Sequence, residues 1–187
     1  MNISICPLQR FRCFLNFIII SIFFLTSPLT LNAQEKIGDL SNREKIISTA
    51  KEIMTAARYC ALITIDSTRQ PHVRTMDPFP PDTNMVIWFG TNSKSRKVKE
   101  ILNNPNVTLY YPEPKQDGYV VIKGIAEIIN DKMEKEMYWK KEWEAFYPGK
   151  EASYILIKVT PVQLDILSYK HGLIGNPYTW RIPSIKF

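Results

Sequence analysis

The amino-acid sequence predicts a mainly β protein, an antiparallel barrel of six strands with flanking helices. Three observations lead to this fold class. Apolar stretches rich in β-branched and aromatic residues recur at close spacing after residue 59. Short turns containing Gly, Pro, Asn or Asp separate most of them. The chain also lacks the regular alternation of strands and helices that a doubly wound parallel sheet requires.

The first 33 residues have the pattern of a secretory signal peptide. Arg10 and Arg12 supply positive charge, an apolar run follows from Phe14 to Leu25, and Ala33 is a small residue at a cleavage position. The apolar run is short for a membrane span. We therefore expect cleavage near Ala33, export to the periplasm or the exterior, and a single domain over residues 34–187 with no stable membrane span. An uncleaved anchor is the alternative.

Charge, cysteines and histidines exclude several function classes. Loss of Arg10 and Arg12, with no acidic residue, lowers the formal net charge from +6 to +4. Without a basic block interleaved with aromatics, we expect no nucleic-acid partner. Cys60 is the cysteine left after cleavage, so an internal disulfide and a multi-cysteine zinc site are excluded, and we expect Cys60 in the core. His72 and His171 lack partners at metal-ligand spacing, so we expect polar surface or loop histidines and no metal site.

The first elements of the mature chain are a helix and a β-hairpin. A capping box at Ser41–Glu44 predicts a helix that ends near Ala57. Its buried face is predicted to hold Ile46, Ile47, Ala50, Ile53, Met54 and Ala57. Residues 60–66 and 71–76 predict the two strands of the hairpin. Alternation along the second strand places His72, Arg74 and Met76 on one face and Val73 and Thr75 on the other.

Four more strands are predicted, over residues 85–89, 106–111, 119–129 and 154–167, the last with a break at Pro161. Gly124 indicates a bulge or a close backbone approach. Asp131 is expected to cap a helix that runs to about Phe146, with Trp139, Trp143 and Phe146 on its buried face. The tail from Ser168 is predicted to be loop.

A short helix between the third and fourth strands has an unusual start. It is predicted to begin near Ser95 and to stop at Asn103–Asn104. Its buried face is predicted to hold Val98, Ile101 and Leu102. Arg96 and Lys97 occupy the first turn, although a helix N-terminus carries a partial positive charge that disfavours cations. A bound anion such as phosphate would account for this pattern, and a solvated basic turn is the alternative.

Four segments together resemble the pyridoxamine 5′-phosphate oxidase-like proteins. They are 70–76 (Gln-Pro-His-Val-Arg-Thr-Met), 88–92 (Trp-Phe-Gly-Thr-Asn), 95–97 (Ser-Arg-Lys) and 103–109 (Asn-Asn-Pro-Asn-Val-Thr-Leu). The resemblance covers about residues 46–167 and is nearest to the small general-stress-protein-like branch. It implies a six-stranded split β-barrel that binds FMN, usually at the interface of a homodimer.

The resemblance also implies which residues bind the cofactor. They are Arg74, Thr75, Met76, Gly90, Thr91, Ser95, Arg96, Lys97 and Tyr119. Arg74 and the basic pair after Ser95 match the residues that hold the flavin phosphate. Gly90 and Thr91 match a strand end that contacts FMN, the Thr75–Met76 segment would run along the flavin ring, and Tyr119 stands where the oxidases have Gln. No side chain is expected to act as a catalytic acid or base, because the flavin carries the chemistry.

Departures from the vitamin B6 oxidases argue against vitamin B6 synthesis. Phe79 stands where those enzymes have a lysine, and the Tyr and Arg that grip their substrate phosphate have no clear match in residues 133–146. Their C-terminal ending is not reproduced by Trp180–Pro183. We therefore expect an exported FMN-dependent oxidoreductase that transfers electrons or hydride between flavin and a small molecule. The alternative is a non-enzymatic module that holds flavin, haem or another small ligand on the same barrel.

Overall fold

The computed structural model describes residues 28–147, 149 and 153–187. Residues 1–27, most of the predicted signal peptide, lie outside the described residues. The chain divides into two units, Met1–Glu44 and Lys45–Phe187, and the strands of the described residues all belong to the second. Helices of the described part are all too short or too polar to cross a membrane. Cleavage at Ala33 and a single domain over 34–187 stay predictions.

The elements follow one another in a simple order. They are α2 (Pro28–Ala57), β1 (Cys60–Ile65), β2 (Pro71–Met76), β3 (Ile87–Asn92), α3 (Arg96–Asn103), β4 (Asn106–Pro112), β5 (Gly118–Ile129), α4 (Lys132–Met137), the 3₁₀ helix η2 (Lys141–Trp143), β6 (Tyr154–Ser168) and β7 (Ser184–Lys186).

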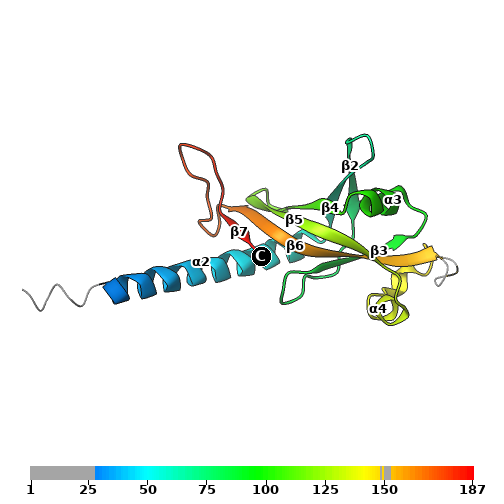
Figure 1. Cartoon of the computed structure of the whole chain (residues 1–187), viewed down its shortest axis with the longest axis horizontal. Helices are drawn as coiled ribbons and strands as arrows, with labels where there is room; N and C mark the ends of the chain where they lie inside the picture. Colours follow the sequence, from blue (N-terminus) through cyan, green and yellow to red (C-terminus); the bar gives the residue numbers. More distant parts are fainter. Residues whose placement is uncertain (1–27, 148, 150–152) are drawn as a thin grey trace, which may run out of the picture. The chain divides into compact units, whose positions relative to one another are not determined.

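The described strands form one seven-stranded antiparallel sheet in the order β2-β1-β4-β5-β6-β3, with β7 paired to β6 (Figure 1). The β1–β2 hairpin pairs Cys60 with Met76 and Ile65 with Pro71, as predicted. The segment that follows edge strand β2 meets edge strand β3 through an isolated bridge between Pro78 and Phe89, and β2 and β3 themselves form no ladder. The barrel is therefore split, and the predicted fold class is confirmed.

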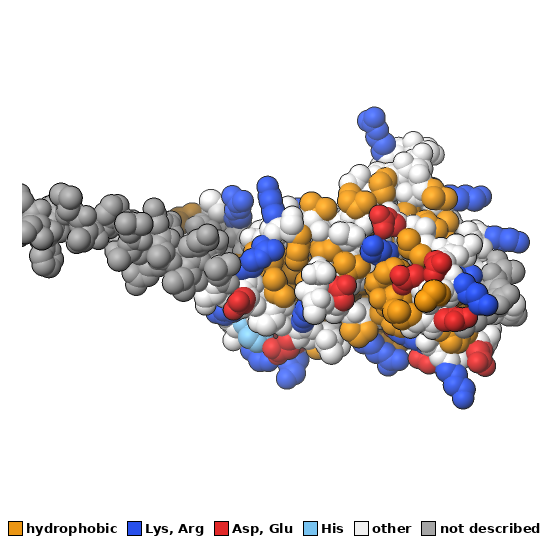
Figure 2. Space-filling view, turned by 60° about the horizontal axis from the view of Figure 1, so that its bottom comes forward, with side chains coloured by type: hydrophobic (Ala, Val, Ile, Leu, Met, Phe, Trp, Pro, Cys, Tyr) orange, Lys and Arg blue, Asp and Glu red, His pale blue; other side chains and the backbone are white. Residues whose placement is uncertain are grey.

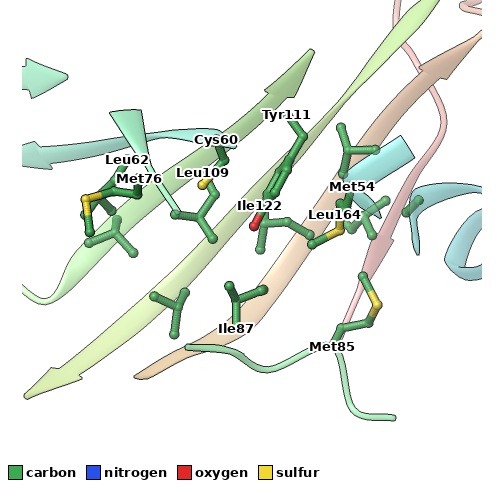
Figure 3. Close-up of a cluster of buried hydrophobic side chains, with 14 of the residues drawn as sticks. Met54, Cys60, Leu62, Met76, Met85, Ile87, Leu109, Tyr111, Ile122 and Leu164 are labelled. Carbon is green, nitrogen blue, oxygen red and sulfur yellow. The ribbon is translucent and has the colours of Figure 1, made fainter. Parts of the chain in front are cut away.

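The core lies between one face of the sheet and the C-terminal part of α2. Ile46, Ala50, Ile53 and Met54 are buried in it, and Ile47 and Ala57 pack against it, which confirms the predicted helix face. The sheet contributes fully buried Leu62, Leu109, Ile122 and Leu164 (Figure 3). Cys60 is 2% exposed among them, as predicted. Each such aliphatic side chain contributes roughly 1.5–3 kcal/mol to folding.

A second, aromatic cluster packs on the other side of β3. Its buried members are Trp88, Trp143, Tyr154 and Leu156, and Phe79, Val86, Ile129, Tyr138, Trp139 and Tyr147 pack against them. The rings of Trp88 and Tyr138 stack with centroids 4.4 Å apart. Because Ile87 and Phe89 enter the main core while Trp88 enters the aromatic cluster, β3 is covered on both faces.

Two helix predictions were wrong in their limits. The helix α2 begins at Pro28, so the capping box at Ser41–Glu44 lies inside it. Asp131 does cap α4 by accepting a hydrogen bond from Glu134 N at 3.1 Å, but α4 ends at Met137. The Tyr138 carbonyl accepts a hydrogen bond from the Tyr154 hydroxyl, so it is not used for a further helical turn. Phe146 is consequently 75% exposed instead of buried.

Three strand predictions also need correction. The third strand begins at Ile87, because Met85 has a φ of +62° that belongs to a turn. Pro161 does not break β6, because it lies opposite Gly124 at the register shift of a bulge, and this bulge at Gly124 was predicted. The tail is not all loop, since β7 pairs with residues 163–165. A three-residue strand is too short to leave an alternation pattern.

Candidate functional site

The predicted phosphate-binding residues lie where β2, β3 and α3 meet. Arg74 projects from β2, Thr91 lies near the end of β3, and Ser95 precedes the first turn of α3, which holds Arg96 and Lys97. Lys97 Nζ donates a hydrogen bond to Thr91 Oγ1 at 3.0 Å, and that hydroxyl lies 3.4 Å from Ser95 Oγ. The structure therefore brings these five residues together.

Glu100 organises this group of side chains. It is only 4% exposed on α3, and its Oε2 accepts hydrogen bonds from Thr64 Oγ1 at 2.5 Å and from Arg74 Nη2 at 2.8 Å. Arg74 also donates to Thr64 Oγ1. Glu100 Oε1 lies 3.0 Å from Arg96 Nε. We call Thr64, Arg74, Thr91, Ser95, Arg96, Lys97 and Glu100 together the Glu100 cluster.

Sequence reasoning missed Glu100 and instead placed Leu102 on the buried face of α3. Leu102 is 71% exposed, whereas Val98, Glu100 and Ile101 are buried. A signal was present, because an Arg followed four residues later by a Glu forms an ion pair on one side of a helix. That pair also explains part of the basic first turn without any external anion.

Electrostatics keep Glu100 ionised. Burial by itself would raise the pKa of Glu100, but the hydrogen bonds from Thr64 and Arg74, with the charges of Arg74 and His72, lower its pKa below the usual value. Burial, followed by the charge of Arg74, lowers the pKa of Lys97, while Glu100 acts in the opposite direction. An additional anion beside Lys97 would therefore favour its ammonium form.

The Glu100 cluster carries a net charge of +2 when Lys97 is protonated. Arg74, Arg96 and Lys97 are three cations, and Glu100 is one carboxylate, so the net charge is +2. A phosphate monoester near neutral pH carries a charge of about −1.5 to −2. The charge left over after the internal ion pairs therefore matches one phosphate monoester.

His72 and Asp66 extend the cluster toward solvent. His72 Nε2 lies 2.9 Å from Asp66 Oδ2 and 3.8 Å from Glu100 Oε1. Asp66 Oδ1 also accepts hydrogen bonds from the backbone amides of Thr68 and Gln70, which holds the β1–β2 turn. The His72 hydrogen bond and those of the turn lower the pKa of Asp66. His72 is thus a partly exposed polar residue, as the sequence predicted.

Four residues that were predicted to bind the cofactor are not members of the Glu100 cluster: Thr75, Met76, Gly90 and Tyr119. Thr75 is exposed on the outer face of β2, whereas the Met76 side chain is buried in the core. A Cβ on Gly90 would lie 2.3 Å from Trp143 Cζ3, so this glycine packs against the aromatic cluster. Tyr119 is on β5, with β1 and β4 between it and β2, and its ring centroid lies 5.6 Å from that of Tyr110.

The donors of the cluster suit a phosphoryl group. Guanidinium and ammonium groups form charge-assisted hydrogen bonds with phosphate oxygens. The Ser95 hydroxyl makes no capping hydrogen bond to α3. The first two amides of a helix have no intrahelical partner, whereas the next amide of α3, that of Val98, donates to the Ser95 carbonyl at 3.1 Å. Among the residues that the structure describes, no group of three or more His, Cys, Asp and Glu side chains is arranged to hold a metal ion.

Comparison with known proteins matches most of the chain to one protein family. A family model described as "Pyridoxamine 5'-phosphate oxidase like" matches residues 44–166. General stress protein 26 of Bacillus subtilis (strain 168) is 26% identical over 131 residues, which cover 68% of this chain and 91% of that protein.

Solved structures share the fold. General Stress Protein 26 from Bacillus anthracis str. Sterne is 29% identical with a TM-score of 0.55, and the match covers 66% of this chain and 92% of that one. A pyridoxamine 5'-phosphate oxidase-related, FMN binding protein from Nostoc punctiforme PCC 73102 is 17% identical with a TM-score of 0.54, covering 74% and 91%. The second likeness concerns the fold alone.

Proposed function

The chain belongs to the pyridoxamine 5'-phosphate oxidase like family, and we propose that it is an exported FMN-dependent oxidoreductase that transfers electrons or hydride between flavin and a small molecule. The Glu100 cluster is the observation that carries this proposal. Arg74, Arg96 and Lys97 converge from β2 and α3 and retain a net charge of +2 after pairing with Glu100.

In this proposal the cluster binds the phosphate of FMN. Arg96 is 68% exposed and can turn toward a ligand, whereas Arg74 is held by Thr64 and Glu100 and acts as a fixed charge. Lys97 and the hydroxyls of Thr91 and Ser95 complete the donor set. When bound, FMN supplies the redox chemistry at its ring, and the protein supplies binding and orientation.

The outer side of β2 is our candidate for contact with the flavin ring. Thr75 and Val73 are exposed there, and β2 is an edge strand, so one row of its backbone N–H and C=O groups faces away from β1. Such groups can hydrogen-bond the polar edge of an isoalloxazine ring. The Met76 side chain is excluded from this role because it lies in the core.

We further propose a homodimer through the outer face of the sheet. Val73, Tyr110, Ile125 and Val162 expose 65%, 38%, 37% and 48% of their surface, and a groove of about 290 Å³ runs beside Ile125 and Val162. Exposed apolar side chains on adjoining strands favour burial against a second chain. Light scattering of the wild type and of Val73→Glu with Val162→Glu tests this point, with a monomeric variant expected.

Export is proposed on the basis of the N-terminal sequence. Arg10, Arg12 and the apolar run before Ala33 have the signal-peptide pattern. Mass spectrometry of the protein from its native cells should find a chain that begins at residue 34 in the exported fraction. A full-length chain in the membrane fraction would instead support an uncleaved anchor.

Binding of FMN tests the central proposal. Purified protein should show a flavin absorbance band or take up added FMN. Arg96→Ala with Lys97→Ala should weaken FMN binding at least tenfold, because two cations of the phosphate site are lost. Lys94→Ala with Lys99→Ala is the matched control, since both lysines are exposed and flank the same turn. Equal affinity of the wild type and the Arg96/Lys97 variant would refute this phosphate site.

Redox behaviour separates an enzyme from a binding module. Bleaching of the flavin band by a nicotinamide nucleotide or by dithionite, with recovery in air, shows that the bound flavin can accept and release electrons. Reduction by the nucleotide at a rate far above that of free FMN is expected of an oxidoreductase. A rate equal to that of free FMN would favour the non-enzymatic alternative.

A further inference from the structure

The segment between β6 and β7 carries the most exposed aromatic side chains of the described residues. Tyr178 is 91% exposed and Trp180 83%, and Ile174, 55% exposed, lies close to them in sequence. Figure 1 shows this segment as a loop that stands out from the sheet. We call residues 174–181 the aromatic loop. The family model matches the chain only as far as residue 166, and the flavin proposal gives this loop no role.

Hydrogen bonds hold the aromatic loop in one shape. Asn176 Oδ1 accepts hydrogen bonds from the backbone amides of Tyr178 at 2.9 Å and Thr179 at 3.0 Å. The Asn176 carbonyl accepts from Trp180 N at 2.8 Å, and Asn176 N donates to the Arg181 carbonyl at 2.9 Å. Trp180 has a φ of +57°, a left-handed conformation that is disfavoured for a bulky side chain. A fixed backbone therefore presents the two aromatic rings to water.

The base of the segment is anchored to the rest of the domain. Ser168 and Leu173 exchange two backbone hydrogen bonds, and Leu173 is buried in the main core. Lys170 N donates to Asp117 Oδ2 at 2.8 Å, and Lys170 Nζ lies 2.5 Å from Glu52 Oε1. At the other end of the segment, β7 pairs with β6. The aromatic loop is thus a rigid projection from a fixed base.

The charges of this part of the chain have one sign. Residues 166–187 contain Lys170, Arg181 and Lys186 but no Asp or Glu. The first of these lysines is paired with Glu52 at the base, whereas Arg181 is exposed on the aromatic loop itself. On the face shown in Figure 2, by contrast, acidic and basic side chains are intermingled. The whole chain has a formal net charge of +6, so long-range attraction also favours an anionic surface.

The shape of the aromatic loop selects the kind of partner. A cavity of about 310 Å³ after β2 and the groove beside Ile125 and Val162 are lined by no residue of the loop. A projecting loop does not enclose a small ligand, but it can enter a soft surface. Tyr and Trp rings settle at the level of lipid headgroups, where a neighbouring cation meets the lipid phosphates. These features together favour a lipid bilayer.

From the exposed rings, the rigid backbone and the one-sided charge, we propose that the aromatic loop inserts Tyr178 and Trp180 into the headgroup region of a bilayer that carries anionic lipids. Arg181 contacts the lipid phosphates. The protein then lies on the membrane surface through this loop. This contact depends neither on FMN nor on an N-terminal anchor.

Quenching of Trp180 by brominated lipid tests the proposal. The full chain is mixed at low salt with vesicles of three parts brominated phosphatidylcholine to one part phosphatidylglycerol. Because Trp88, Trp139 and Trp143 belong to the aromatic cluster, we expect the quenching to be at least about fourfold smaller in Trp180→Phe. Lipid binding by the apolar run Phe14–Leu25 alone would leave Trp180 unquenched. Unquenched wild type, or equal quenching in Trp180→Phe, would overturn the proposal.

Two pairs of variants locate the contact. Tyr178→Ser should reduce the quenching of Trp180 at least about threefold, while Met133→Ser, which changes a 77% exposed side chain on α4, should leave it unchanged. Arg181→Glu should also reduce it at least about threefold, and Lys132→Glu, the same charge change at an exposed position of α4, should reduce it less. Equal effects within either pair would contradict the proposal.

Two further measurements decide between occupants. Vesicles without phosphatidylglycerol should quench the wild type at least about threefold less, and equal quenching would refute the preference for anionic lipid. Before lipid is added, the difference spectrum between the wild type and Trp180→Phe should be that of a tryptophan in water. A blue-shifted difference spectrum would mean that a second copy of the chain already covers the loop, and would overturn the proposal.

Discussion

Arg74 Nη2 and Glu100 Oε2 lie 2.8 Å apart and join the edge strand β2 to helix α3. The Arg74 side chain is 17% exposed and that of Glu100 4%, so this ion pair is shielded from water. Thr64 donates a hydrogen bond to the same oxygen from β1. Because both groups have hydrogen-bonding partners, the pair holds α3 against the sheet and fixes the position of the Arg74 guanidinium.

Glu100→Gln should destabilise the fold. The amide keeps the shape of the side chain but removes the charge that Arg74 and Arg96 face, and hydrogen bonds to charged groups are worth about 1.5–3 kcal/mol. We expect the free energy of unfolding in urea to fall by about 2 kcal/mol. Glu136→Gln on the exposed side of α4 is the control and should change it by less than about 0.5 kcal/mol. A loss in Glu100→Gln no larger than in the control would show that the pair contributes no net stability.

The contribution of Glu100 should depend on pH in a defined direction. Its pKa is lowered in the folded state, so its stabilisation is complete above the usual carboxyl pKa of 4.5 and is lost as the pH falls through the lower, folded pKa. The difference in unfolding free energy between the wild type and Glu100→Gln should be constant from pH 7 to about pH 5.5 and shrink below about pH 4.5. A difference that grows on acidification would have the wrong sign for this assignment.

Tyr111→Phe should stabilise the protein. Tyr111 Oη is buried and, among the described residues, has no hydrogen-bond partner except the neighbouring Cys60 thiol, which is a weak one. Burial raises the pKa of Tyr111, so the hydroxyl stays protonated and its desolvation is poorly compensated. Removal should raise the free energy of unfolding by about 1 kcal/mol. The exposed neighbour Tyr110, changed to Phe, should have little effect, and a loss of stability in Tyr111→Phe would reveal a partner for the hydroxyl.

Gly90→Ala should destabilise the protein by overpacking the aromatic cluster. A Cβ at this position would lie 2.3 Å from Trp143 Cζ3 and 2.6 Å from Tyr154 Cε2, so the aromatic cluster must shift. Overpacking of this kind costs about 1–3 kcal/mol in unfolding free energy. Trp143→Leu in the same chain should recover part of that loss, which a double-mutant cycle measures. Strictly additive losses would show that the methyl group does not meet Trp143.

Local pattern accounts for much of the fold. The turn residues between 66 and 71 and the alternation of β2 were enough to predict the hairpin and both faces of its second strand. Gly124 predicted the bulge, and Asn103–Asn104 predicted the end of α3. These features depend on residues that are neighbours in sequence or on the period of a single strand, which is why they can be recognised without tertiary contacts.

Positions controlled by distant partners could not be predicted in this way. The end of α4 depends on Tyr154 of β6, whose hydroxyl donates a hydrogen bond to the Tyr138 carbonyl. The pairing of β7 depends on β6, and the fit of Gly90 depends on Trp143. Leu102 shows the opposite error: its apolar side chain predicted burial, but it is 71% exposed in the structure. Tertiary packing overrides local preference at each of these positions.

The sequence by itself determined the mainly β fold class and the set of cations, Arg74, Arg96 and Lys97, that point to an anion. The tertiary structure decided that Glu100 stands among them and leaves a net charge of +2. Thr64 and Arg74 lie 36 and 26 residues away from Glu100 along the chain. A buried carboxylate is stable only when such partners surround it, and the sheet order that assembles them is not written in any local pattern.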